Sequence, residues 1–193
     1  MNGWSQTPAP EPGGGLADDL ERTDDLERTQ VSSGRLSEPE RLVARLTELG
    51  WTLGVAESLT GGLVLSSIVD VAGSSHVLRG GVVAYATDLK AALLGVDETL
   101  LAAHGPVHPR VARQMAEGVR RTVAGAGEAA DVGIATTGIA GPVSPDGQPV
   151  GTVHLAVATA LGSRVESLRL TGGRASIRAE AAARAIRMAL EAL

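Results

Sequence analysis

The sequence TLGVAESLTGGLVLSSIV, residues 52–69, predicts a buried strand, a turn and a helix in direct succession. Thr52–Ala56 is almost entirely apolar and suits a buried strand, and Glu57–Gly62 (ESLTGG) combines the hydroxyls and glycines that are typical of a turn. Leu63–Val69 is apolar again and predicts a helix. A strand that passes through a short turn into a helix is the building unit of α/β proteins.

The chain on either side of this unit continues the alternation of helices and strands. Ser37 and Glu40 form the signature of a capping box at the start of a helix that Gly50 ends. The later elements are expected to be a strand at 77–86, helical segments at 87–94, 98–103 and from 109, a strand at 131–137, a hairpin at 153–157 with 164–170, and a helix at 174–193. The alternating strand of that hairpin is expected to be half-exposed. The pattern predicts an α/β fold, a three-layer α/β/α sandwich on a mixed, mostly parallel sheet of about five or six strands.

Charge and composition divide the 193 residues into two parts. Residues 1–40 hold nine acidic and three basic side chains, whereas residues 41–193 hold 13 and 14, so the net charge of −5 comes from the N-terminal part. Residues 1–36 are rich in Pro, Gly, Ser and acidic residues, and DDLERT occurs twice in tandem at 18–29. This composition predicts a disordered acidic tail over 1–36 and a folded domain over 37–193.

The composition also excludes several classes of protein. The chain has no Cys, which removes disulfides, thiolate nucleophiles and Cys-ligated metals. It has no run of ~18 apolar residues that could span a membrane and no secretory signal at its start. We therefore expect a soluble cytoplasmic protein with no membrane partner. The near-neutral main part and the 2% aromatic content do not suit a nucleic-acid binder, and the composition is compatible with a homo-oligomer.

Three turns that are rich in glycine and hydroxyl groups are candidates for binding a ligand, at 57–62, 73–75 and 136–142. The first and third follow predicted strands, where open α/β sheets place their ligands. Glycine lets backbone N–H groups approach an anion at a helix start. The structural alternative is that Ser58 or Thr60 is a helix N-cap and that the glycines only turn the chain.

The common cofactor and metal signatures are missing from this sequence. Gly133 and Gly138 have the spacing of a phosphate loop, but Ile139 and Ala140 replace its Lys and hydroxyl residue. No dinucleotide-binding glycine motif follows a predicted strand. His104 and His108 have the spacing of a zinc pair, yet the intervening Gly105-Pro106 forbids a regular helix. We expect neither a cofactor nor a metal.

Lys90 is the only Lys among 17 basic residues, and Tyr85, five positions earlier, is the only Tyr. Compositional drift toward Arg is one explanation. A chemical explanation is that a Ser hydroxyl becomes a good nucleophile only when a base takes its proton. Lys can be that base when burial keeps it neutral, whereas Arg always stays protonated. The Tyr85 hydroxyl could then relay the proton or hold the nucleophile.

Several segments together resemble the CinA C-terminal domain family, the nicotinamide-nucleotide amidases. The matching segments, spread over about residues 38–193, are AESLTGG (56–62), AGSS (72–75), GGVVAYATDLKAALLGV (80–96), VARQMAEGVR (111–120), TTGIAGP (136–142) and PVGTVHLAVAT (149–159). The resemblance implies an α/β/α domain that uses a metal-independent Ser/Lys mechanism. The reaction it implies is hydrolysis of nicotinamide mononucleotide to nicotinate mononucleotide and ammonia, in pyridine nucleotide recycling.

The resemblance also implies a role for individual residues. It makes Ser75 the nucleophile, Lys90 the base and Tyr85 the assisting hydroxyl, with Ser58 as the rival nucleophile because it too lies in a signature turn. The groups implied to bind the small nucleotide substrate or its oxyanion are Ser58, Thr60, Gly61, Gly62, Thr137 and Gly138, with Arg174 and Arg178 for the ribose-phosphate.

The sequence departs from the family pattern in places. Leu59 stands where the family often has Cys, and the loop 143–148 is less Gly-rich than usual. Larger members carry an additional N-terminal nucleotide-processing domain, whose activity is not expected here. Two alternatives to the amidase remain: a non-catalytic partner-binding protein associated with competence and recombination, and an amidase for another small amide.

Overall fold

The computed structural model describes residues 36–144 and 147–193. The predicted tail at 1–36 lies outside the described residues, apart from Leu36. The elements along the chain are α1 (Glu38–Leu49), β1 (Leu53–Glu57), α2 (Leu63–Val69), the 3₁₀ turn η1 (Ser74–His76), β2 (Leu78–Val83), α3 (Thr87–Leu94), α4 (Glu98–His104), α5 (Pro109–Thr122), β3 (Val132–Gly138), β4 (Thr152–Thr159), β5 (Gly162–Arg169) and α6 (Arg174–Glu191). None of the described helices has the length and apolar composition to cross a bilayer.

The five strands in the described residues form one mixed sheet in the order β2-β1-β3-β4-β5. Strand β1 pairs in parallel with β2 and β3, whereas β4 is antiparallel to both β3 and β5. Four strands therefore run in one direction and β4 alone runs against them, which confirms the expected mixed, mostly parallel sheet. Because β1, β2 and β3 run the same way, the residues that follow them meet at one edge of the sheet.

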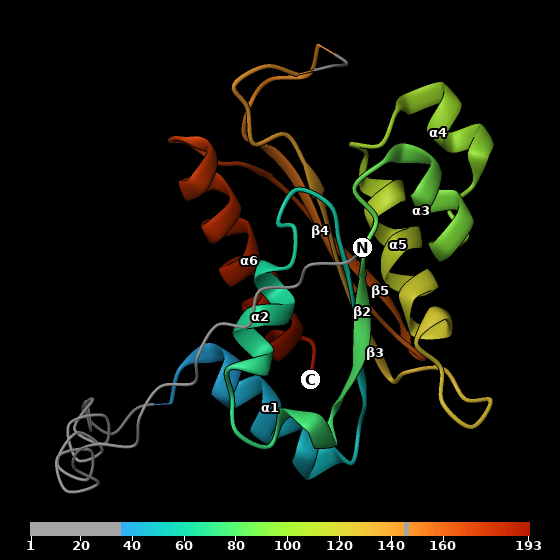
Figure 1. Ribbon diagram of the computed structural model, residues 1–193, viewed down its shortest axis with the longest axis vertical. Coiled ribbons are helices and arrows are strands. Elements are labelled where there is room, and N and C mark those ends of the chain that lie inside the picture. The colour runs from blue at the N-terminus through green and yellow to red at the C-terminus, as the bar shows by residue number, and fades with distance from the viewer. Residues whose placement is uncertain (1–35, 145–146) are drawn as a thin grey trace, which may run out of the picture. The chain divides into compact units, whose positions relative to one another are not determined.

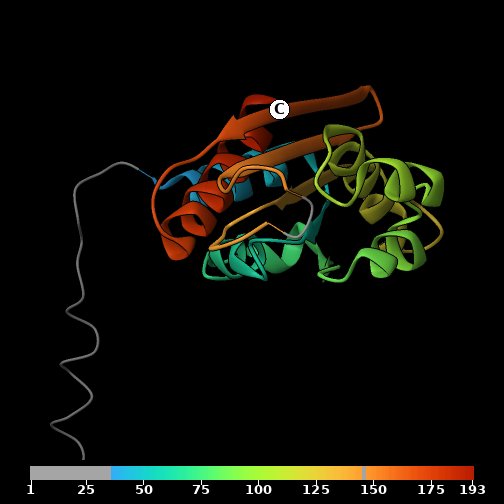
Figure 2. The same ribbon diagram turned by 90° about the horizontal axis from the view of Figure 1, so that it is seen from above.

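The helices cover both faces of the sheet. Helices α1, α2 and α6 pack on one face and α3, α4 and α5 on the other, as Figure 1 and the view from above in Figure 2 show. On the first face the strands place large aliphatic residues such as Val55 and Ile134. On the second they place small ones, including Ala56, Ala135 and Ala156. The predicted three-layer α/β/α sandwich is confirmed.

Strand β4 corrects one expectation. Its alternating sequence predicted a half-exposed strand, but all six residues from Val153 to Ala158 are buried. The residues that alternate with the large aliphatic ones are mostly alanine, and they face the helices of the second face rather than water. Alternation between large and small residues therefore reports how closely each face is packed, whereas alternation between apolar and polar residues reports exposure.

Most local predictions are confirmed, with shifted boundaries. The capping box between Ser37 and Glu40 is present in both directions, and Gly50 ends α1 in the left-handed conformation. The strand predicted to reach residue 86 ends at Val83, because the chain leaves the sheet to begin α3. Helix α3 begins at Thr87, as predicted, and Ala86 is its N-cap.

Helix α5 lies so close to α3 that one position accepts no side chain. A Cβ added at Gly118 would overlap the backbone carbonyl of Leu94 at the end of α3. Backbone atoms cannot move aside as a flexible side chain can, so Gly118→Ala should lower the free energy of unfolding by roughly 2 kcal/mol or more. Urea denaturation measures this change. The exposed Arg121→Ala on the same helix is the control, expected to stay within about 0.5 kcal/mol of the original chain; equal stability of all three proteins would contradict the close packing.

Candidate active site

A cavity of about 380 Å³ opens at the edge of the sheet where β1, β2 and β3 end. The segments that follow these strands, the residues just before α5 and the first residue of α6 together form its walls. The lining residues are Ser58, Leu59, Tyr85, Thr87, Lys90, Pro106, Val107, Thr137, Gly138, Ile139, Ala140, Gly141, Val143 and Arg174. No carboxylate side chain lies among these residues, so among the described residues only cationic and neutral groups face a ligand.

Lys90 is the largest polar side chain in the protein's described interior, and it is fully buried. It lies in the first half of α3, and its amine points back toward the end of β2. The Nζ donates to the carbonyl oxygens of Ala84 at 2.7 Å and Tyr85 at 3.3 Å, and to the Ser58 hydroxyl at 3.1 Å. When the amine is neutral, its two N–H groups can remain on the carbonyls while its lone pair faces the Ser58 hydroxyl.

Burial lowers the pKa of Lys90 to about 8, against a smaller opposing effect of the Asp88 carboxylate. Removal from water disfavours the charged amine, because the low-dielectric interior does not replace its hydration. At neutral to mildly alkaline pH a substantial fraction of Lys90 is therefore able to accept a proton. Desolvation is the condition that a lysine base requires.

Ser58 is the serine that the fold brings to Lys90. It is the first residue after β1 and is 8% exposed, toward the cavity. Its backbone N–H donates to the carbonyl of Thr136 on β3 at 3.0 Å, which fixes its backbone at the edge of the sheet. The hydroxyl thus lies at the cavity wall, within hydrogen-bond reach of an amine that can take its proton.

Ser75 does not meet Lys90, which corrects the expectation that it is the nucleophile beside that base. It is exposed on η1, before β2 begins, whereas Lys90 lies beyond the end of β2. A strand of six residues separates the two positions by roughly 20 Å at 3.3 Å per residue. The rival residue, Ser58, occupies the place that Ser75 was expected to hold.

The backbone N–H groups at the end of the 57–62 turn and the start of α2 bind the Glu57 carboxylate, whereas an external anion was expected there. Glu57 is completely buried and accepts the backbone N–H groups of Gly62 at 2.8 Å, Val64 at 3.3 Å and Leu65 at 2.9 Å. Gly61 and Gly62 therefore do not line the cavity. Glu57 was missed from the sequence, although a carboxylate shortly before a helix start is a known capping signal.

Thr60 is likewise a structural residue in this geometry. It is fully buried, its hydroxyl shares a hydrogen bond of 2.7 Å with the Thr136 hydroxyl, and it does not face the cavity. Thr137 and Gly138, by contrast, line the cavity. The Thr137 hydroxyl donates to the carbonyl of Pro106 at 2.8 Å and ties the cavity wall before α5 to the end of β3.

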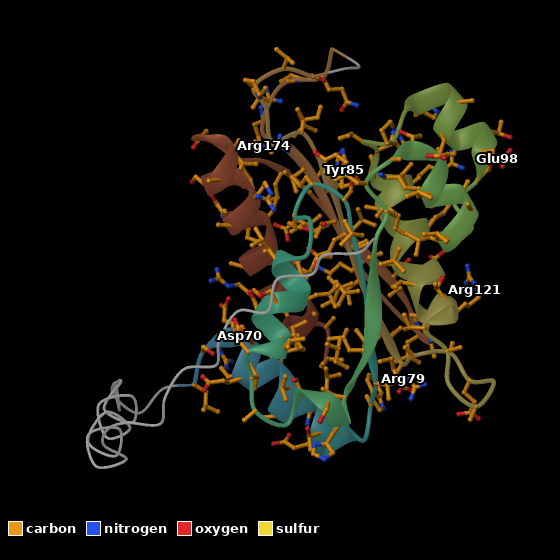
Figure 3. The ribbon with its side chains drawn as sticks, viewed as in Figure 1. Asp70, Arg79, Tyr85, Glu98, Arg121 and Arg174 are labelled. Carbon is orange, nitrogen blue, oxygen red and sulfur yellow. The ribbon has the colours of Figure 1, made fainter. Side chains whose placement is uncertain are left out.

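The two arginines and Tyr85 lie around the cavity in different roles. Tyr85 is 59% exposed, and its hydroxyl accepts from the Arg174 guanidinium at 3.0 Å rather than contacting Ser58 or Lys90. Figure 3 shows both labelled side chains at the same end of the sheet. Arg174 also donates to the carbonyl of Gly141 at 2.7 Å and lines the cavity. Arg178 does not line it, because its guanidinium binds backbone carbonyls of the 57–62 turn.

Three histidines near the cavity, His104, His108 and His154, are not among its lining residues. The rings of His104 and His108 stack with centroids 4.7 Å apart, and His108 caps α5 by accepting the N–H of Arg110. Burial lowers the pKa of His154, with a smaller contribution from nearby His108. Across the described ranges no group of three or more His, Cys, Asp or Glu side chains has the arrangement of a metal site.

Comparisons with known proteins agree with this fold. The sequence model of the CinA C-terminal domain matches residues 36–193. A CinA-like protein of Frankia casuarinae is 48% identical over 141 residues, which cover 73% of this chain and 31% of that protein. The chain thus spans about a third of the length of such curated relatives.

Solved structures with the same fold carry related names. The competence/damage inducible protein CihA from Agrobacterium tumefaciens is 36% identical, with a TM-score of 0.71 over 83% of this chain and 99% of that one. A CinA superfamily protein from Klebsiella pneumoniae is 32% identical, with a TM-score of 0.74 over 80% and 94% of the two chains.

Proposed function

Because the chain belongs to the CinA C-terminal domain family, we propose that its cavity is the active site of a Ser/Lys amidase that hydrolyses nicotinamide mononucleotide. The products are nicotinate mononucleotide and ammonia. The observation that carries the proposal is the contact of 3.1 Å between the buried Lys90 amine and the Ser58 hydroxyl at the cavity wall. The relatives' names give only the family, so the reaction rests on this geometry and on the resemblance.

The reaction starts with proton transfer from Ser58 to neutral Lys90. The Ser58 oxygen attacks the carboxamide carbon and forms a tetrahedral intermediate, whose negative charge lies near the newly charged Lys90 ammonium. That ammonium then returns its proton to the departing nitrogen, so ammonia leaves and Ser58 carries the acyl group. Lys90, neutral again, activates a water that hydrolyses the ester and releases the carboxylate product.

The charges around the cavity favour a substrate with an anionic end. Arg174 is the cation at the mouth, and no carboxylate lies among the described lining residues to repel a phosphate. The guanidinium has a planar fork of donors that suits phosphate oxygens. A nucleotide whose phosphate meets Arg174 would direct its other end into the cavity.

Purified protein with nicotinamide mononucleotide should release ammonia and nicotinate mononucleotide in equal amounts, measured by a coupled ammonia assay and by chromatography. Nicotinamide riboside, free nicotinamide, glutamine and asparagine form the comparison panel, and the mononucleotide should have the largest kcat/KM. If the protein hydrolyses only another amide of the panel, that amide replaces nicotinamide mononucleotide as the proposed substrate. Binding of the nucleotide without turnover would favour the non-catalytic partner-binding alternative.

Lys90 should give the activity a specific dependence on pH. Its pKa of about 8 in the folded protein means that the neutral, reactive form increases as pH rises toward 8 and dominates above it. The value of kcat/KM should therefore rise about tenfold per pH unit well below 8 and level off above it. A profile measured from pH 6 to pH 9.5 with the ammonia assay tests this, at constant ionic strength.

Asp88→Asn is the directional control for that profile. The Asp88 carboxylate opposes the effect of burial and raises the pKa of Lys90. Its removal should lower that pKa, so the rising limb of the profile should move to lower pH while the plateau stays the same. Asp88 is exposed and does not line the cavity. If the rising limb of the pH profile does not move, a group other than Lys90 controls the pH dependence of kcat/KM.

A further inference from the structure

Arg178 binds the turn that carries Ser58 rather than the cavity. It lies on α6 one helical turn after Arg174, on the same side of the helix. Its Nε donates to the carbonyl of Leu59 at 2.9 Å and its second nitrogen to that of Thr60 at 2.7 Å. These carbonyls belong to the two residues directly after Ser58. Both arms of the guanidinium fork therefore hold the backbone segment that positions the Ser58 hydroxyl.

Glu57 holds the end of the same turn. Its buried carboxylate accepts three backbone N–H groups at the start of α2, between Gly62 and Leu65. The donors after the turn therefore meet an anion, and the carbonyls within the turn meet a cation. Charge-assisted hydrogen bonds of this kind are shorter and stronger than neutral ones.

We propose that Arg178 is a positioning residue for Ser58, with Glu57 as its counterpart, and that Arg178 takes no part in binding the substrate phosphate. This inference rests on the proposed amidase function, since it names what keeps the nucleophile beside Lys90. It also replaces the role in phosphate binding that the resemblance implied for Arg178.

The local backbone explains why the turn needs such support. Gly61 and Gly62 have φ angles of +60° and +99°. Glycine adopts such angles without strain but also adopts many others, so the backbone of these two residues does not by itself fix the shape of the turn. The Ser58 backbone N–H and the Thr60 hydroxyl both bond to Thr136 on β3, but neither bond holds the carbonyls of Leu59 and Thr60. Without Arg178 the carbonyls of Leu59 and Thr60 would lose their charged donor, and the Ser58 hydroxyl could drift away from the amine.

A kinetic comparison separates positioning from phosphate binding. In Arg178→Lys and Arg178→Ala we expect kcat to fall about 10–100-fold, because a displacement of about 1 Å costs roughly that much, while KM for nicotinamide mononucleotide changes little. The same fall should occur with nicotinamide riboside, which has no phosphate. A raised KM with unchanged kcat, seen only with the phosphorylated substrate, would overturn the proposal. Arg184→Ala, an exposed arginine on the same helix, is the matched control.

A second readout does not depend on amidase activity. A fluorophosphonate reagent labels an activated serine, and intact-mass spectrometry follows its addition to Ser58. Labelling should be slower in Arg178→Ala than in Arg184→Ala and should recover in part when guanidinium is added at a non-denaturing concentration. Glu57→Gln should slow it as well, because an amide can accept but also presents N–H groups to the helix start.

Failure of the proposed amidase function can therefore be distinguished from failure of the positioning role of Arg178. If the original chain releases no ammonia from any amide but its Ser58 is labelled faster than that of Arg178→Ala, the proposed function fails and the positioning role stands. If Arg178→Ala melts at the same temperature as the original chain and is labelled at the same rate, the positioning role is wrong.

Discussion

Ser58→Ala should lower kcat for nicotinamide mononucleotide hydrolysis by at least ~10³-fold, because removing the nucleophile of a serine hydrolase leaves only binding and electrostatic contributions. The substituted oxygen is the one that the Lys90 amine reaches at 3.1 Å. Ammonia release under saturating substrate measures the loss. Binding of the nucleotide, followed by isothermal titration calorimetry, should stay within a few-fold, because alanine removes one hydroxyl and leaves Arg174 and the other lining residues in place.

Ser75→Ala is the matched control for this substitution. It removes the same kind of atom from an exposed position before the start of β2, whereas Lys90 lies after the end of that strand. It should keep the activity of the original chain within about twofold, as most exposed substitutions away from a site do. Quenching a single turnover with acid should trap an acyl group on Ser58 that mass spectrometry can locate. The assignment is wrong if Ser75→Ala loses activity while Ser58→Ala keeps it.

The α/β/α architecture could be predicted because its signals are local. The capping box at Ser37, the turn after β1 and the spacing of apolar residues each act within a few residues of one another. Helix and strand periods follow from backbone geometry, so a single sequence carries them. The burial of β4 on both faces was not predictable in this way, because it depends on helices from distant parts of the chain that pack on its alanines.

The family resemblance favours Ser75 and keeps Ser58 as the rival, yet one sequence feature indicates that Ser58 is the serine that lies beside Lys90. Ser58 follows a predicted strand, whereas Ser75 precedes one. In a sheet whose neighbouring strands are parallel, residues that follow strands gather at one edge and residues that precede them gather at the other. Lys90 follows β2, so only Ser58 could share its edge.

The roles of the charged groups around the turn depend on three-dimensional distances that the sequence does not contain. Glu57 was overlooked because a carboxylate next to a strand suggests exposure, whereas here the start of α2 supplies three N–H donors to it. Arg174 and Arg178 looked equivalent because they share one side of α6. Only the first reaches the cavity, since one helical turn moves the second to the carbonyls behind Ser58.

Lys90→Arg should lower hydrolysis by at least ~10³-fold at every pH from 6 to 9.5, because a guanidinium stays protonated over this whole range and cannot take the Ser58 proton. The ammonia assay across that pH range measures the loss. The Lys90 amine also donates to the carbonyls of Ala84 and Tyr85. If it served only to hold those carbonyls, an arginine could replace it with part of the activity retained, so activity in Lys90→Arg would contradict its role as the base.

Lys90→Met separates loss of chemistry from loss of folding. Methionine has a flexible side chain without a charge and suits the fully buried position of Lys90, whereas arginine introduces a larger and permanent cation there. Circular dichroism should show both variants folded, with Lys90→Arg the less stable of the two. A folded and inactive Lys90→Met shows that an apolar side chain of suitable shape is not sufficient. Together with an inactive Lys90→Arg, it requires at this position a group that can both carry a proton and give it up.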